Sequence, residues 1–183
     1  ACKLIVPGST VIIDAGSTTL QMIPYLRNLS SLNLVTNDVF IASALYDAPN
    51  ITVNVLGGCL RKGFYSLVGY YTEQNVADMH ADLCIIGTDA VSLSTGLMIS
   101  NMDEVGLKRG IIAASNKVAV VCDHTKFSTK AFLTVCNLDE VDIIITGHAI
   151  DQQTLQGLRM LQKEVRLISR SGAIPFPEME ATD

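Results

Sequence analysis

The chain has 183 residues, 49% of them apolar, and a formal net charge of −5. Its length suits one domain with a buried core, and no apolar run approaches the roughly 18 residues that a membrane-spanning helix needs. Because the longest basic runs are Arg61-Lys62 and Lys108-Arg109, this segment lacks the basic footprint that is usual for nucleic-acid binding. We expect a cytoplasmic protein, since no secretory signal pattern is found.

Strand-like apolar runs alternate with helical patterns along the chain. Runs such as Val118-Ala-Val-Val-Cys122 do not alternate with polar residues, which is typical of parallel strands covered on both faces. This order predicts an α/β fold with a mostly parallel sheet and helices on both faces. In chain order, the predicted elements are strand 11–14, helix 17–29, strand 32–36, helix 38–47, strand 51–56, a small hairpin at 59–69, helix 70–79, strand 82–86, helix 102–115, strand 118–122, strand 141–146, helix 151–163, strand 165–168 and a tail at 170–183.

The five cysteines form no C-x-x-C pair, and the three histidines form no H-x-x-x-H pair. Cys84 and Cys122 lie inside apolar runs, where a reduced thiol behaves as a small hydrophobe. We therefore predict free thiols rather than a disulfide framework or a zinc site, and we expect no metal and no cofactor.

Short polar or glycine-containing sequences follow five of the predicted strands. In a parallel sheet the carboxyl ends of the strands meet at one edge, where such folds bind their ligands. We therefore expect the five sequences to converge there. They are Asp14-Ala-Gly16, Thr36-Asn37-Asp38, Gly57-Gly58, Gly87-Thr-Asp89 and Asp123-His-Thr-Lys126.

The segment 11–20 is the first candidate anion site. An apolar run ends at a glycine bend with Gly16, and Ser17, Thr18 and Thr19 then begin a helical pattern. Unpaired N–H groups and the macrodipole of a helix N-terminus attract phosphate or carboxylate, and the three hydroxyls add donors. The alternative interpretation is a plain N-cap at Ser17.

A second candidate group is formed by Asn101, Glu104 and Lys108, which share one face if they lie on a helix. Asp89 follows the preceding strand and is expected to lie opposite the helix face that these three residues share. Carboxylates beside a lysine bind sugar hydroxyls or move protons next to a carbonyl. The alternative is an exposed Glu–Lys pair.

Three further features remain open at this point. Lys126 is either a point charge that neutralises a phosphate or a solvated loop lysine. Arg61 is interpreted as part of a solvated surface or of a subunit contact. Gly106 and Gly110 are unusual inside a predicted helix. Close helix–sheet packing or a nearby ligand would account for them.

Taken together, the motifs over about residues 4–170 closely resemble the C-terminal effector-sensing domain of the DeoR/GlpR family of bacterial transcriptional regulators. No single motif is specific, but their joint order and spacing are. The motifs are Asp14-Ala-Gly-Ser-Thr-Thr19, Thr36-Asn37, Leu56-Gly-Gly58, Leu67-Val-Gly69, Gly87-Thr-Asp89, Gly96-Leu, Asn101, Glu104, Lys108-Arg109 and Asp123-His-Thr-Lys126-Phe.

The resemblance implies a Rossmann-like fold similar to ribose-5-phosphate isomerase, glucosamine-6-phosphate deaminase and CoA transferases. It implies a phosphorylated sugar or sugar metabolite as effector, a homodimer or homotetramer, and DNA binding only through an N-terminal helix-turn-helix that this chain does not contain. Ala90 departs from the glycine that the family often has after Asp89, and the loop there is expected to differ slightly.

We therefore expect residues 1–169 to form the effector-binding domain of a DeoR-type repressor of sugar metabolism, without catalysis. The alternatives are a phosphosugar isomerase- or deaminase-like enzyme using Asp89, Glu104 and Lys108, and a pure oligomerisation module. The predicted ligand-binding residues are Asp14, Gly16, Ser17, Thr18, Thr19, Thr36, Asn37, Gly57, Gly58, Asp89, Asn101, Glu104, Lys108, Asp123 and Lys126.

Overall fold

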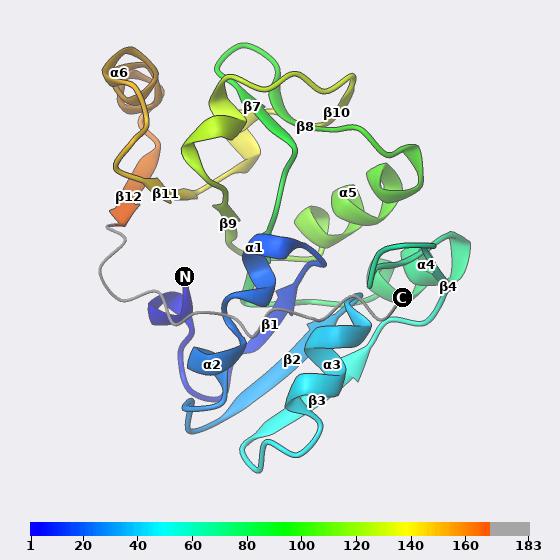
Figure 1. The fold of residues 1–183 in the computed structure, drawn as a ribbon. Helices are drawn as coiled ribbons and strands as arrows, with labels where there is room; N and C mark the ends of the chain where they lie inside the picture. The colour runs from blue at the N-terminus through cyan, green and yellow to red at the C-terminus, as the bar shows by residue number, and fades with distance from the viewer. Residues whose placement is uncertain (169–183) are drawn as a thin grey trace, which may run out of the picture.

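A seven-stranded, fully parallel sheet forms the centre of the computed structural model, which describes residues 1–168 (Figure 1). The predicted tail at 170–183 lies outside the described residues. All seven predicted strands are confirmed, with ends within two residues of the expected ones. In sheet order they are β12 (Glu164–Ile168), β11 (Ile143–Gly147), β9 (Val118–Val121), β6 (Leu83–Ile86), β1 (Thr10–Ile13), β2 (Leu32–Thr36) and β3 (Ile51–Val55).

Helices cover both faces of this sheet, as predicted. On one face, α2 (Ile23–Leu26) and α3 (Val39–Leu45) pack with α1 (Ser17–Leu20) against side chains such as Ile13 and Ile85. On the other face, α4 (Tyr70–Ala77), α5 (Val105–Ala113) and α6 (Gln152–Met160) pack against Ile12, Ile86 and their neighbours. The central strands are buried on both faces, which explains their continuous apolar sequences.

The predicted helix at 17–29 is wrong, because two separate one-turn helices, α1 and α2, stand in its place. Pro24 lies in the first turn of α2. Proline has no backbone N–H and its ring clashes with the preceding turn, so a helix begins near it rather than running through it.

A small antiparallel sheet was not predicted. Its strands are β7 (Ala90–Ser92), β8 (Gly96–Ile99) and β10 (Leu133–Cys136), in the order β10-β8-β7, and Figure 1 shows them together in the upper part of the molecule. The strands are very short, and β8 pairs with a segment far along the chain. Local sequence patterns therefore carry little signal for them.

The predicted 59–69 hairpin is confirmed, with β4 (Cys59–Leu60) paired antiparallel to β5 (Leu67–Val68). Two backbone hydrogen bonds attach it to the loop after β2. The N–H of Leu67 donates to the carbonyl of Asn37 at 2.8 Å, and the N–H of Val39 donates to the carbonyl of Tyr65 at 3.0 Å. The hairpin is therefore held beside the carboxyl end of the sheet.

Gly106 and Gly110 are explained by contact between helices. A Cβ atom on Gly110 would lie 2.7 Å from Cγ1 of Val76, and one on Gly106 would meet the carboxylate of Glu73. Both partners belong to α4, which packs against α5. The expected helix–sheet contact or ligand contact is therefore wrong, and the small residues allow two helices to approach closely.

The cysteines carry a prediction about reactivity. Cys84 and Cys122 are buried, and burial raises the pKa of both thiols to about 12, whereas Cys59 is exposed. Since the thiolate is the reactive form, we expect iodoacetamide at neutral pH to label Cys59 quickly and the two buried thiols only after unfolding. Mass spectrometry of native and denatured samples, with Cys59→Ser as control, measures this. Rapid native labelling of Cys84 would contradict the buried placement.

Within residues 1–168, none of the helices has the length and apolar character needed to cross a membrane.

Candidate functional site

The carboxyl ends of the central strands meet at one edge, as the parallel order requires. Ile13 of β1 is in register with Thr36 of β2 and with Ile85 of β6, so the loops that follow these strands are neighbours. We call this edge the carboxyl rim and define it as residues 14–19, 36–38, 87–89 and 122–126.

A buried ion pair forms the floor of the carboxyl rim. The ammonium group of Lys108, from α5, donates to the carboxylate of Asp14 and, at 3.0 Å, to the carbonyl of Gly87. Asp14 is 2% exposed and Lys108 is 4% exposed. The two charges therefore neutralise each other away from water, and neither side chain is free to bind a phosphate without breaking the pair.

Two carboxylates at the rim have raised pKa values. Burial raises the pKa of Asp14 above its ordinary value, although Lys108 opposes the shift, and the charge of Glu104 adds to it. Burial also raises the pKa of Asp38, whose carboxylate caps α3 by accepting the N–H groups of Phe40 and Ile41 at 2.8 and 3.0 Å. The floor of the rim thus disfavours additional negative charge.

Thr36 and Asn37 connect the loops of the rim to one another. The hydroxyl of Thr36 donates to the carbonyl of Ile13 at 2.7 Å. The side chain of Asn37 accepts the N–H of Ala15 at 2.8 Å and donates to the carbonyl of Leu67 at 3.3 Å. Both side chains are buried, so they position the bend after β1 and the 59–69 hairpin.

The bend after β1 exposes the hydroxyls of Ser17 and Thr18, whereas Thr19 is buried and donates to the carbonyl of Gly16 at 2.8 Å. The N–H of Gly16 faces the carboxylate of Asp38 and lowers the pKa of that carboxyl, but burial raises the same pKa by more. Because α1 is a single turn, few peptide dipoles align in it. Ser17 and Thr18 are therefore the exposed donors of this bend.

Asp89, Asn101 and Glu104 lie around the loop that leads into α5. Asp89 accepts the N–H of Ser100 at 2.8 Å, and Asn101 caps the 3₁₀ turn Met102–Glu104 by accepting the N–H of Asp103 at 3.0 Å. The expected shared helix face is only partly correct, because the α-helix begins at Val105. Asp89 precedes β7 and Asn101 follows β8, and the hydrogen bond from Ser100 to Asp89 joins these two segments.

Sequence reasoning missed the role of Arg61. Its Nη1 donates to Oε1 of Glu104 at 2.8 Å, and its guanidinium lies 3.6 Å from the ring centroid of Phe64. The hydroxyl of Ser66 lies 3.2 Å from the same oxygen of Glu104. The signal available in the sequence was the position of Arg61 just after the Gly57-Gly58 pair that ends the third strand.

Gly57 and Gly58 have structural roles at the start of the hairpin. Gly58 has φ 141°, and a Cβ there would lie 2.0 Å from Oγ1 of Thr72. The carbonyl of Gly57 accepts the hydroxyl of Thr72 at 2.5 Å. Packing therefore explains Gly58, whereas a Cβ on Gly57 would lie at an ordinary contact distance, 3.5 Å from Nδ2 of Asn75.

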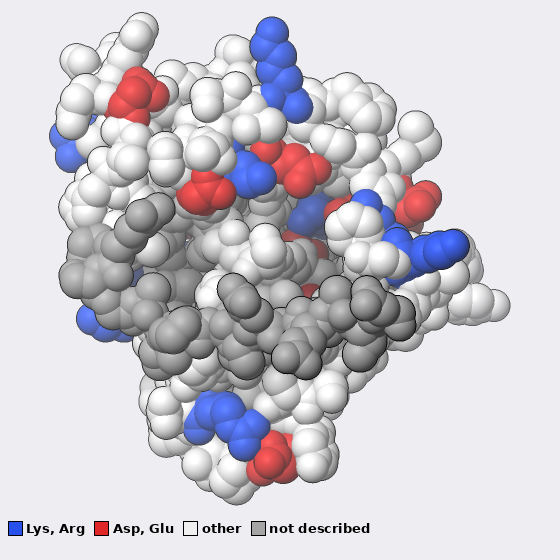
Figure 2. Space-filling view, viewed as in Figure 1, with Lys and Arg blue, Asp and Glu red and all other residues white. Residues whose placement is uncertain are grey.

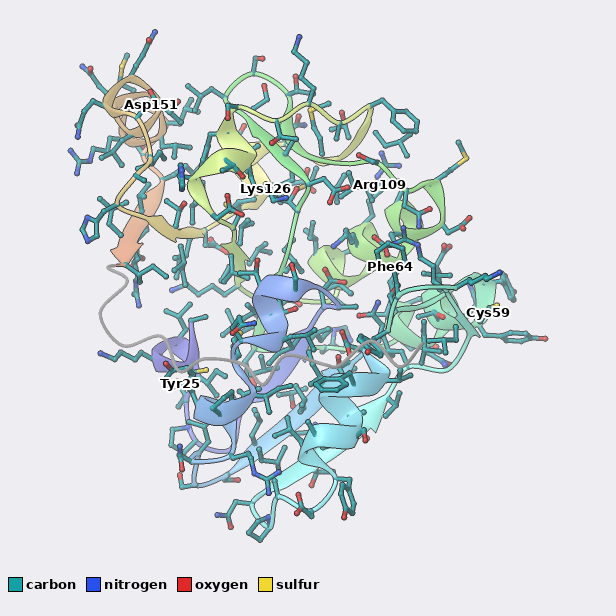
Figure 3. The ribbon with its side chains drawn as sticks, in the orientation of Figure 1. Tyr25, Cys59, Phe64, Arg109, Lys126 and Asp151 are labelled. Atoms are coloured by element: carbon teal, nitrogen blue, oxygen red, sulfur yellow. The ribbon has the colours of Figure 1, made fainter. Side chains whose placement is uncertain are left out.

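Asp123 and Lys126 lie on the other flank of the rim, since they follow β9 whereas the hairpin follows β3. Asp123 caps the 3₁₀ turn His124–Phe127 by accepting the N–H of Thr125 at 2.7 Å. Among the described residues, no hydrogen bond or ion pair joins Lys126 to Asp14 or Lys108. Figure 3 shows Lys126 and Phe64 on separate elements.

Charge and shape add two observations. On the face in Figure 2, Lys and Arg side chains lie singly or beside acidic ones and form no continuous basic patch. Two cavities of about 280 and 290 Å³ lie elsewhere, one at Leu93, Gly157 and Met160 and the other over the strand positions of Asn33 and Asn54. Neither is lined by a predicted ligand-binding residue.

Comparisons with known proteins agree with the resemblance. The family model of the DeoR C terminal sensor domain matches residues 1–148. A putative aga operon transcriptional repressor from Escherichia coli O157:H7 is 32% identical over 168 residues, covering 92% of this chain and 62% of that protein. The glycerol-3-phosphate regulon repressor of E. coli K12 is 31% identical, covering 76% and 55%. The chain spans about three fifths of the length of the curated relatives it matches.

Two solved structures are similar to this chain. The eIF2B delta subunit from Chaetomium thermophilum aligns with a TM-score of 0.52 at 15% identity, covering 78% of this chain and 51% of that chain. Ribose 5 phosphate isomerase A from Neisseria gonorrhoeae aligns with a TM-score of 0.48 at 16% identity, covering 69% and 49%. The eIF2B likeness supports a Rossmann-like α/β fold.

The curated relatives are named as transcriptional regulators and the family model is that of a sensor domain, so the isomerase- or deaminase-like alternative using Asp89, Glu104 and Lys108 is not retained. By its family match and its relatives, the chain belongs to the DeoR family, as the C-terminal sensor domain of a transcriptional regulator.

Proposed function

We propose that residues 1–169 form an effector-binding domain that holds a phosphorylated sugar or sugar metabolite at the carboxyl rim. One observation carries the proposal: the loops after β1, β2 and β6 are bound to one another around the Asp14–Lys108 pair, with the hydroxyls of Ser17 and Thr18 exposed beside them. The name of one relative, the glycerol-3-phosphate regulon repressor, refers to a small phosphorylated metabolite.

From these contacts we infer two roles for the predicted residues. The Gly16–Thr19 bend faces the phosphate in this proposal, and the exposed or partly exposed side chains of Asp89 and Asn101 accept hydrogen bonds from sugar hydroxyls. The buried side chains hold the loops in place. These positioning residues are Asp14, Thr36, Asn37 and Lys108, while Gly57, Gly58 and Asp123 shape the neighbouring turns.

Binding is a signal only if the effector prefers one of two global arrangements of the regulator. We propose that the sensor domain forms a homodimer or homotetramer, and that the effector repacks its subunit interface and so changes the spacing of the DNA-binding heads of the full-length protein. Small-angle scattering of the full-length regulator, with and without saturating effector, tests this step. Unchanged quaternary geometry at saturation would count against it.

Calorimetry with matched ligand pairs tests the ligand class. The 183-residue chain is titrated with ribose 5-phosphate, fructose 6-phosphate and glycerol 3-phosphate, and with the corresponding unphosphorylated compounds. We expect at least one phosphorylated compound to bind, and its unphosphorylated partner to bind much more weakly because it lacks the charged hydrogen-bond acceptors. A chain that binds none of them, yet still forms oligomers, would instead be a pure oligomerisation module.

The variant Lys126→Ala tests which of the two flanks of the rim holds the phosphate. If Lys126 neutralises the phosphate across water, its removal is expected to weaken binding by about threefold to tenfold and to reduce the salt dependence of binding. Calorimetry at two salt concentrations measures both effects, with Lys130→Ala as the control on the following exposed loop. An affinity equal to that of the unsubstituted chain would assign the phosphate to the opposite flank.

A further inference from the structure

A phosphate at the carboxyl rim needs a cation, and the buried lysine is not available. Lys108 is neutralised by Asp14, and the rim also contains the carboxylates of Asp38 and Asp89. A group of this composition repels an anion unless a further positive charge faces it. Two described cations adjoin the rim: Lys126, in the turn after β9, and Arg61, in the 59–69 hairpin.

Arg61 has the geometry of an anion-binding residue. Its side chain is 26% exposed and that of Glu104 is 18% exposed, so the pair is partly withdrawn from water. One nitrogen, Nη1, contacts Glu104, and the Phe64 ring supports the guanidinium at 3.6 Å. A guanidinium has five N–H donors in a planar fork that matches a carboxylate or a phosphate, so donors remain beyond the one bond to Glu104.

The hairpin that carries Arg61 is connected to the bend after β1 through the loop after β2. The side chain of Asn37 contacts both Ala15 and Leu67. The backbone of Asp38 forms an isolated antiparallel β-bridge with that of Ser66, and the carboxylate of Asp38 faces the N–H of Gly16. Ser66 in turn contacts Glu104. These contacts link the hairpin that carries Arg61 to the bend that carries the exposed hydroxyls of Ser17 and Thr18.

We propose that Arg61 binds the anionic group of the effector, and that the carboxylate of Glu104 occupies Arg61 until the effector's phosphate replaces it. This inference rests on the proposed function, because it concerns the same phosphorylated effector. A phosphate oxygen is the same kind of acceptor as Oε1 of Glu104, so the exchange replaces one charged hydrogen bond by another. The displaced Glu104 is then free to accept hydrogen bonds from sugar hydroxyls.

The test compares two substitutions that have opposite expected effects. Ribose 5-phosphate and inorganic phosphate are the probes, and calorimetry on the 183-residue chain is the measurement. Arg61→Gln removes the cation and is expected to weaken binding of either probe by about tenfold or more. Glu104→Gln removes the competing charge but keeps the side-chain shape, and is expected to strengthen binding of inorganic phosphate by about threefold or more.

The pair Arg27–Asp47 supplies matched controls. It is an ion pair of similar length, 2.9 Å between Nη1 of Arg27 and Oδ1 of Asp47, but it is more exposed and joins α2 to the end of α3, away from the rim. Arg27→Gln and Asp47→Asn are expected to leave both affinities unchanged. Circular dichroism of each variant verifies folding, and if Arg61→Gln does not fold, the Glu104→Gln result decides.

The outcomes separate this inference from the proposed function. If the unsubstituted chain binds ribose 5-phosphate and Arg61→Gln binds it equally well, the inference is wrong while the proposed function stands. Weaker phosphate binding by Glu104→Gln would likewise overturn the exchange. If the unsubstituted chain binds neither these probes nor any other phosphorylated compound in the panel above, both proposals are overturned.

Discussion

Replacing Lys108 by methionine is expected to lower the free energy of unfolding by about 3–5 kcal/mol at neutral pH. The substitution keeps a long side chain in α5 but leaves the carboxylate of Asp14 buried without a cation. Such an isolated charge loses its hydration and gains no compensating partner. Urea unfolding followed by circular dichroism measures the difference, and Lys130→Met, on an exposed residue, is the control.

The loss in the free energy of unfolding caused by Lys108→Met is expected to become smaller as the pH falls. Burial already raises the pKa of Asp14 and Lys108 opposes that shift, so removing the lysine raises the pKa further. A carboxyl with a raised folded-state pKa binds its proton more tightly in the folded protein than in the unfolded one. Its stabilising effect is therefore present at low pH and is lost as the pH rises through the folded pKa.

The double variant Asp14→Asn/Lys108→Met tests whether charge is the cause. With both charges removed, no ion is left buried, and we expect the double variant to be more stable than Lys108→Met at neutral pH. Equal stability of Lys108→Met and the unsubstituted chain would show that the two side chains do not form the buried pair. A deficit independent of pH would point to lost packing rather than lost charge.

Thr18→Asp is expected to weaken binding of the phosphorylated effector by about tenfold to a hundredfold. The hydroxyl of Thr18 is exposed at the bend after β1, and a carboxylate there would face the phosphate of the proposed complex. Two like charges several ångströms apart near a protein surface repel each other with about 1–3 kcal/mol, less as salt is added. Calorimetry with the tightest-binding compound of the phosphorylated panel measures the loss.

Two controls separate charge from shape and from net charge. Thr18→Val removes the hydroxyl without adding a charge, and we expect a smaller loss than for Thr18→Asp. Ser30→Asp adds the same charge at an exposed position before β2, at the opposite end of that strand from the rim, and should leave the affinity unchanged. Unaltered binding by Thr18→Asp would place the phosphate away from this bend.

The sequence alone determined the central sheet of this protein and the chemistry at its edge. Seven apolar runs predict seven strands, and all seven are present; central strands such as β6 and β9, whose sequences do not alternate with polar residues, are buried on both faces. Parallel pairing then requires the loops after β1, β2 and β6 to meet. Local periodicity was sufficient for these features because each strand, with its adjoining loop, is short and continuous in the chain.

Only the tertiary structure decided which of those polar side chains pair with one another. Asp14 and Lys108 are 94 positions apart, and Arg61 and Glu104 are 43 apart. Lys108 was among the predicted ligand-binding residues, but its charge is buried and neutralised beside Asp14. The same limit applies to β8 and β10, whose pairing joins distant segments. Such contacts depend on how the helices and loops pack over the sheet, and periodicity within one segment contains no information about that packing.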